Sequence, residues 1–186
     1  MKYRQKKGKN IVEIEFLENK IKYFLQDDGS SGSFDIRPET ISKDTITFLE
    51  KNNGFKNYSI YLLIIGLVFA FMTFFLKIFT FYIPFLLGSI IMVTLYRLSF
   101  VKYTIIETTK KKIYIIQDKN HDEIVKKIFD MRNQYYKDIY FKFIPENNVK
   151  DEADKFKWLL DEEIITQAEY QSVLSEIQHT NTTVEN

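Results

Sequence analysis

Hydrophobic residues are spread very unevenly along this 186-residue chain. Two uncharged runs of 19 residues, 58–76 and 78–96, are separated only by Lys77, and 30 of the 39 positions in 58–96 are apolar or aromatic. As a helix, each run is about 28 Å long, close to the hydrocarbon thickness of a bilayer. Neither run has the polar stripe of a soluble surface helix. The pattern predicts a transmembrane hairpin over 57–101, with helices near 57–77 and 82–101.

Basic residues around this hairpin predict its orientation. The tip offers only Lys77, whereas the flanks on the side of both termini are rich in Lys and Arg. Cytoplasmic flanks carry such an excess, so we expect both termini in the cytoplasm and a multi-pass protein of the inner (cytoplasmic) membrane. The flanking basic residues are Lys51, Lys56, Arg97, Lys102 and 110–112.

Before the hairpin, apolar and charged residues alternate with period two over 12–16 and 20–23, which predicts two strands. A turn at Glu18 and Asn19 sets the register, because it places Ile14 opposite Tyr23 and Glu15 opposite Lys22. A third short strand at 34–36 ends before Pro38. Residues 39–56 are ambiguous and are compatible with a helix leading into the membrane.

After the hairpin, residues 103–108 and 113–117 predict two further strands, and a helix follows from 121 to about 140. Asn120 and Glu123 have the spacing of a capping box at its start. Two or three strands before the hairpin and two after it are too few to be stable alone. A membrane hairpin returns the chain to the face it left, so we expect one split cytoplasmic α+β domain with halves 10–56 and 102–144.

This order of elements resembles the bacterial PH-like membrane proteins. The matching features are strands within 12–36, the apolar insertion, strands within 103–117 and the closing helix. The resemblance implies a small split β-sheet or partial barrel capped by a C-terminal helix. It also implies a binding or scaffolding role, and it brings no catalytic residues.

The C-terminal part differs in charge from the rest of the chain. The whole chain is nearly neutral, at +1, but from Glu146 onward three basic residues face ten acidic ones. Residues 145–149 are interpreted as a linker, followed by a short helix over about 150–160. A second helix starts at Thr166, which forms a capping box with Glu169. We expect a helical hairpin over 150–178 and a disordered tail over 179–186.

The segment WLLDEEIITQAEYQSVL within this hairpin resembles the SHOCT domain, although Glu163 replaces the usual turn glycine. The resemblance implies protein interaction or oligomerisation and no enzymatic activity. Packing of the hairpin against its own chain is the alternative. The candidate residues, as interaction surface or hairpin core, are Phe156, Trp158, Leu159, Ile164, Ile165, Tyr170 and Leu174.

The first nine residues form a strongly basic segment, interpreted as an N-terminal tail. Each basic residue near an anionic leaflet contributes about 1 kcal/mol of attraction, so we expect contact with the membrane surface. Nucleic-acid binding is not expected, because it would require more clustered charge with interleaved aromatic residues. The candidate membrane-contact residues are Lys2, Arg4, Lys6, Lys7 and Lys9.

The composition argues against catalysis. The chain has no Cys and only two His, which excludes thiolate chemistry and Cys-based zinc sites. We find no phosphate-cradling glycine loop and no catalytic constellation, and we expect neither a cofactor nor a metal. The expected function is a non-enzymatic bacterial membrane protein with a PH-like binding or scaffold domain and a SHOCT-like tail. The alternative is an immunity or resistance factor against a bacteriocin or phage, because some small PH-like membrane proteins act in this way and this chain resembles them in size and layout.

Overall fold

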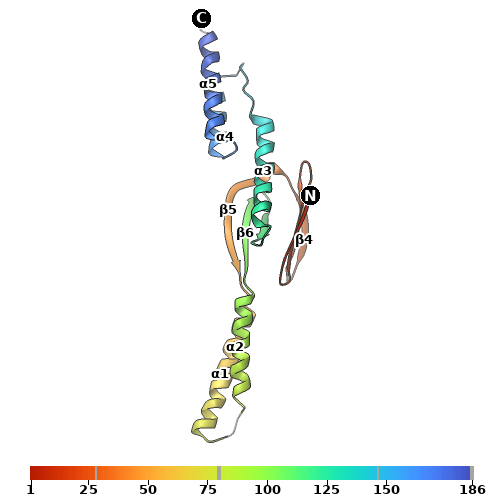
Figure 1. Ribbon diagram of the computed structural model, residues 1–186, viewed down its shortest axis with the longest axis vertical. Coiled ribbons are helices and arrows are strands. Elements are labelled where there is room, and N and C mark those ends of the chain that lie inside the picture. The colour runs from red at the N-terminus through yellow and green to blue at the C-terminus, as the bar shows by residue number, and fades with distance from the viewer. Residues whose placement is uncertain (28, 79–80, 146, 185–186) are drawn as a thin grey trace. The chain divides into compact units, whose positions relative to one another are not determined.

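The computed structural model confirms the predicted mixed α+β class (Figure 1). Within the residues that it describes there are five α-helices and two β-sheets, where one split sheet was predicted. It describes residues 1–186 except 28, 79–80, 146 and 185–186, and it describes the side chains only as far as Ile177. The chain divides into two compact units. The first contains Met1–Ile46 and Thr104–Asn186, and the second contains Thr47–Tyr103.

The first sheet is a four-stranded antiparallel meander. Its strands are β1 (Lys2–Lys7), β2 (Asn10–Phe16), β3 (Ile21–Gln26) and β4 (Ser31–Ile36), in the order β1-β2-β3-β4. The predicted register of β2 and β3 is confirmed, with Ile14 opposite Tyr23 and Glu15 opposite Lys22. Ile14 and Tyr23 are buried in the core, as period-two alternation requires.

The N-terminal segment is an ordered strand, and the prediction of a basic tail over residues 1–9 is wrong for its larger part. Residues 2–7 form β1 and pair with β2. Tyr3 and Gln5 point into the core, while Lys2, Arg4 and Lys6 are exposed on the other face. The sequence does not show the period-two alternation of apolar and polar residues that is typical of a strand, because the inward position 5 is a polar residue, Gln5, that is only 1% exposed.

The second sheet has three strands, in the order β5-β6-β7. They are β5 (Ile41–Glu50), β6 (Val101–Thr108) and β7 (Lys112–Ile116), and a 3₁₀ turn, η1 (Pro38–Thr40), precedes β5. The ambiguous segment 39–56 is therefore mostly strand. β6 and β7 agree with the predicted strands to within two residues at each end.

Buried side chains of the first sheet bond to the backbone of β7. The amide of Gln5 donates to Ile116 O at 2.7 Å and accepts from Ile116 N at 3.0 Å. The hydroxyl of Tyr23 likewise donates to Tyr114 O at 2.9 Å and accepts from Tyr114 N at 3.0 Å. Each pair satisfies a backbone donor and acceptor that would otherwise be buried without a partner.

The helix α3 (His121–Tyr140) follows the sheets and has the predicted bounds. Its side chains Ile124 and Ile128 are completely buried, and it packs against η1 and β7. The predicted capping box at its start is wrong, because the Asn120 side chain makes no capping hydrogen bond. The Glu123 carboxylate accepts a hydrogen bond from Tyr3 Oη at 2.6 Å.

The second unit contains two apolar helices, α1 (Asn53–Phe75) and α2 (Ile83–Leu98), which run side by side (Figure 1). Ser89 Oγ of α2 donates to Ser59 O of α1 at 2.9 Å, and the Phe69 and Phe85 rings meet edge to face. A Cβ at Gly66 would lie 2.7 Å from Leu86 Cδ2, so the glycine permits this close approach.

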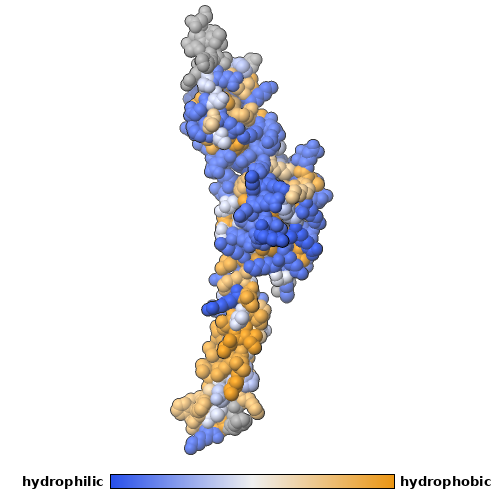
Figure 2. All heavy atoms as spheres, viewed as in Figure 1, coloured by the Kyte–Doolittle hydropathy of each residue, from blue (hydrophilic) through white to orange (hydrophobic). Residues whose placement is uncertain are grey.

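Most of the surface of these helices is hydrophobic and exposed (Figure 2). Phe71, Phe74 and Phe75 of α1 and Ile90 and Ile91 of α2 are all more than half exposed. Among the described residues, α1 alone is long and apolar enough to cross a membrane by itself, whereas α2 has 16 residues. The length of the helices therefore supports the first of the two predicted spans and leaves the second a prediction.

The packing of α1 on α2 predicts that Gly66→Ala will destabilise the helix pair. The new methyl group would meet Leu86, including its backbone nitrogen at 3.3 Å. The matched variant Gly88→Ala meets only the end of the Leu62 side chain at 3.3 Å. In detergent, thermal unfolding should show Gly66→Ala at least about 1 kcal/mol less stable than Gly88→Ala. Equal stability of the two variants would contradict the packing.

Candidate functional site

The acidic C-terminal part folds into a helical hairpin of α4 (Val149–Asp161) and α5 (Gln167–Val184). The predicted capping box is confirmed: Thr166 Oγ1 accepts from Glu169 N at 3.2 Å, and Glu169 Oε2 accepts from Thr166 N at 2.7 Å. Asn148 caps α4 by accepting from Lys150 N at 2.8 Å. The backbone of α5 continues to Val184, beyond the hairpin end predicted at 178, so the predicted disordered tail is helical as far as the structure describes it.

The turn between the two helices has a left-handed residue at the predicted place. Glu163 has φ of 58°, a conformation that glycine adopts readily and that costs other residues about 1 kcal/mol. The turn is closed by Ile164 N, which donates to Leu159 O at 2.9 Å. The chain therefore keeps the turn geometry of a glycine without having the glycine.

The predicted interaction residues divide into two groups. Most of them form the inside of the hairpin rather than an outer surface. Trp158 is the exception, because it is 41% exposed. Its ring lies 5.7 Å from the Tyr136 and Tyr140 rings of α3, edge to face in both cases. The buried residues are Phe156, Leu159, Ile164 and Ile165, and the half-buried ones are Tyr170 and Leu174.

A buried arginine of α3 fixes the hairpin to the rest of its own chain. The Arg132 guanidinium, only 4% exposed, donates from Nη2 to Glu162 Oε2 at 2.5 Å and from Nη1 to Glu162 O at 3.2 Å. Its Nε donates to Ile41 O at 3.0 Å. Arg132 thus connects α3, the start of β5 and the turn of the hairpin. A buried guanidinium needs partners of this kind, because an isolated buried charge is very costly.

Three further polar contacts surround Arg132. Lys43 Nζ donates to Asp161 O at 2.9 Å, and Asn133 Nδ2 donates to Glu163 O at 3.3 Å. Lys137 forms an ion pair with Glu169 at 2.7 Å. The hydrogen bond from Lys137, together with that from the Thr166 amide, holds the pKa of Glu169 below its usual value.

This arrangement is a docking interface between an acidic hairpin and a basic side of α3. In this single chain the hairpin packs on its own α3, which is one of the two alternatives left open by the sequence, and association with a partner or with another copy stays a prediction. Sequence reasoning missed Arg132, Lys43 and Lys137. A signal for Arg132 was present, because it continues the i, i+4 spacing of the buried Ile124 and Ile128 on the apolar side of α3.

The predicted membrane-contact residues lie apart from this interface, on and beside β1. Lys2 and Arg4 both pair with Glu13 of β2, at 2.7 and 3.4 Å. The hydrogen bond that Lys2 donates to the Glu13 carboxylate raises the pKa of Lys2. Lys6 and Lys7 are exposed at the end of the strand, and Lys9 is exposed in the turn that follows. Glu13 therefore neutralises part of the positive charge that this segment would present to a lipid surface.

No protein-family model, no curated protein and no solved structure matches this chain.

The burial of Arg132 predicts that Glu162→Gln will loosen the docked hairpin. The change leaves the guanidinium buried without its carboxylate, at a cost of about 2 kcal/mol, because Glu162 itself is partly exposed. Amide hydrogen exchange in α4 and α5 should therefore become roughly tenfold faster or more. The control Asp154→Asn removes an exposed carboxylate from the same hairpin and should leave exchange unchanged. Wild-type protection in Glu162→Gln would refute the role of the pair.

Proposed function

We propose that this chain is a non-enzymatic bacterial membrane protein in which α1 and α2 anchor a cytoplasmic α+β body. The observation that carries the proposal is the exposed apolar surface of these helices (Figure 2). In water, a surface of that size would be a site of aggregation or binding, whereas in lipid it is solvated. The buried polar groups of this pair, Ser59 and Ser89, are satisfied by backbone oxygens, as a bilayer requires.

The two helices, taken with the uncharged residues at their ends, are long enough to cross the hydrocarbon layer. α1 has 23 residues, or about 34 Å, which exceeds the hydrocarbon thickness of about 30 Å. α2 has 16 residues, or about 24 Å, and its last turn carries Arg97, whose long side chain can reach the headgroups. The uncharged neighbours Phe81, Tyr82, Ser99 and Phe100 lengthen the apolar stretch at both ends.

The charges of the second unit support an orientation with both termini in the cytoplasm. Lys77 is the cation at the tip, between the two helices. The opposite end of the pair carries Lys51, Lys56, Arg97 and Lys102, with Glu50 as the acidic residue there. This asymmetry follows the positive-inside rule for short flanks.

We propose a binding or scaffolding role for the body, of the PH-like kind. A four-stranded sheet, a three-stranded sheet and a closing helix in that chain order support this likeness. The two sheets are connected by side-chain bonds from Gln5 and Tyr23 to β7. The proposal assigns these residues to stability and gives no residue a catalytic role.

We propose that the C-terminal hairpin is a SHOCT-like interaction module that is stored on α3. Its fold places Leu159, Ile164 and Ile165 inside, so it is complete as a unit and needs only a surface to cover its remaining apolar side. That surface is α3 in the docked state. A partner, or the hairpin of another copy, would replace the contacts of Arg132 and Lys137 with its own.

The membrane proposal predicts opposite labelling at two single-cysteine positions. The chain has no native cysteine, so Lys77→Cys and Lys119→Cys each create a unique thiol. In intact spheroplasts of an expressing bacterium, a membrane-impermeant maleimide should label Lys77→Cys and should label Lys119→Cys only after lysis. Both variants should stay in the membrane pellet after alkaline carbonate extraction.

Two results would contradict the proposal. Release of the protein into the supernatant by carbonate would show that α1 and α2 do not anchor it in the membrane. Labelling of Lys119→Cys but not of Lys77→Cys in intact spheroplasts would show that the protein is anchored in the opposite orientation. The wild-type chain, which has no thiol, reports the background labelling in each case.

A further inference from the structure

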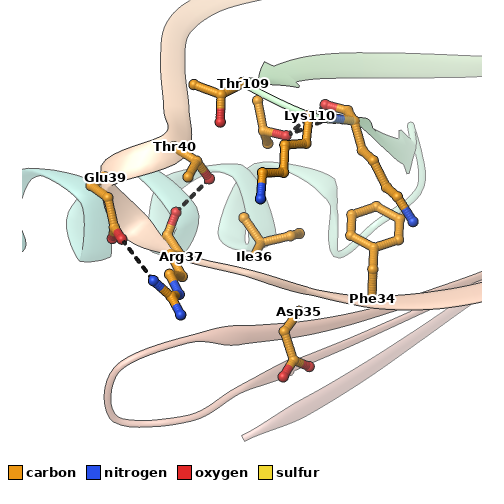
Figure 3. A pocket seen from close by; sticks show the side chains of 10 residues that line it. Phe34, Asp35, Ile36, Arg37, Glu39, Thr40, Thr109 and Lys110 are labelled. Atoms are coloured by element: carbon orange, nitrogen blue, oxygen red, sulfur yellow. Dashed lines mark hydrogen bonds and ion pairs between the residues drawn. The ribbon is translucent and has the colours of Figure 1, made fainter.

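An open cavity of about 450 Å³ lies between the end of β4, the η1 turn and the turn that joins β6 to β7 (Figure 3). Residues 34–37, 39–40 and 108–111 line it. Thr109 N donates to Thr40 O at 3.0 Å and connects the two turns at the rim. The volume falls within the range of about 300–1,000 Å³ that small-molecule sites occupy.

One wall of the cavity is apolar. Phe34 and Ile36 lie on the same face of β4, because side chains alternate along a strand. Asp35 lies on the other side of the strand (Figure 3), where Lys20 binds its carboxylate at 2.6 Å. That hydrogen bond holds the pKa of Asp35 below its usual value. The carboxylate of Asp35 is thus already neutralised by a residue outside the cavity.

The remaining charge of the cavity is positive. The Lys110 side chain extends toward Ile36 (Figure 3), and it has no ion-pair partner within the part of the chain that the structure describes. Lys111 Nζ lies 4.4 Å from the centre of the Phe34 ring. Arg37 is highly exposed and forms a long ion pair with Glu39, with 3.9 Å between Nη1 and Oε1. Glu39 also lines the cavity, where its one negative charge faces the three cations Arg37, Lys110 and Lys111.

We propose that this cavity binds a phosphate monoester that carries a flat apolar group. Such an ester carries close to two negative charges at neutral pH, so it needs more than one cation. Lys110 and Arg37 supply these charges, and the Thr109 hydroxyl is a further donor. Phe34, which is half-buried beside the buried Ile36, offers apolar surface against which a ring can pack. The site lies entirely within the first unit, and the proposal does not depend on the membrane anchor.

Phenyl phosphate is the simplest probe that has both features. The full-length protein in a neutral detergent should bind it in isothermal titration calorimetry. The double variant Arg37→Gln/Lys110→Gln should weaken binding at least tenfold. The matched variant Lys126→Gln, which removes an exposed lysine of α3, should leave binding unchanged. Circular dichroism would verify that all three proteins are equally folded.

The same chemistry can come from a soluble metabolite or from a lipid headgroup, and competition separates the two sources. Displacement of phenyl phosphate by short-chain phosphatidic acid, but not by short-chain phosphatidylcholine, would support a lipid source. Phenyl phosphate binding without competition from phosphatidic acid would support a soluble source. Absence of phenyl phosphate binding at millimolar concentration, equal binding by the double variant, or equal competition by phosphatidylcholine would each overturn the proposal.

Discussion

The pairing of β5 with β6 is the constraint on which the rest of the architecture depends. These strands are neighbours in one sheet, although the two apolar helices separate them in the sequence. Two antiparallel helices return the chain to the place it left, so a long insertion does not prevent the strands from meeting. Within the second unit, Tyr103 Oη donates to Glu50 Oε2 at 3.0 Å, and Asn52 N donates to Ser99 Oγ at 3.4 Å. These bonds hold the ends of the insertion together.

The first unit is then assembled from segments far apart in sequence by a few buried polar groups. Gln5 and Tyr23 bond to the backbone of β7 about a hundred residues away, and burial raises the pKa of the Tyr23 hydroxyl, which keeps it neutral. Arg132 similarly connects β5, α3 and the C-terminal hairpin. Buried polar groups are costly unless all are paired, and each of these specifies one arrangement of the segments it joins.

Local rules predicted the parts of this chain that local interactions determine. The register of β2 and β3 followed from a two-residue turn and the facing of Glu15 and Lys22, and the start of α5 followed from Thr166 and Glu169. β1 was missed because its inward Gln5 is polar and finds its partners, Ile116 of β7 and Asp118, more than a hundred residues away. The docking interface could not be predicted, since Arg132 and Glu162 are 30 residues apart. The cavity is likewise formed by two turns that no sequence pattern connects.

The claim that an apolar helix pair interrupts a body that folds by itself can be tested by excision. Residues 51–100 would be replaced by an Asn-Gly turn, which joins the end of β5 to the start of β6 directly. If the body folds by itself, the shortened protein should be water-soluble, with a well-dispersed amide spectrum and a nuclear Overhauser contact between Tyr23 and Tyr114. A chain that is insoluble, or soluble but without this contact, would show that the body needs the helix pair to fold and would contradict the account.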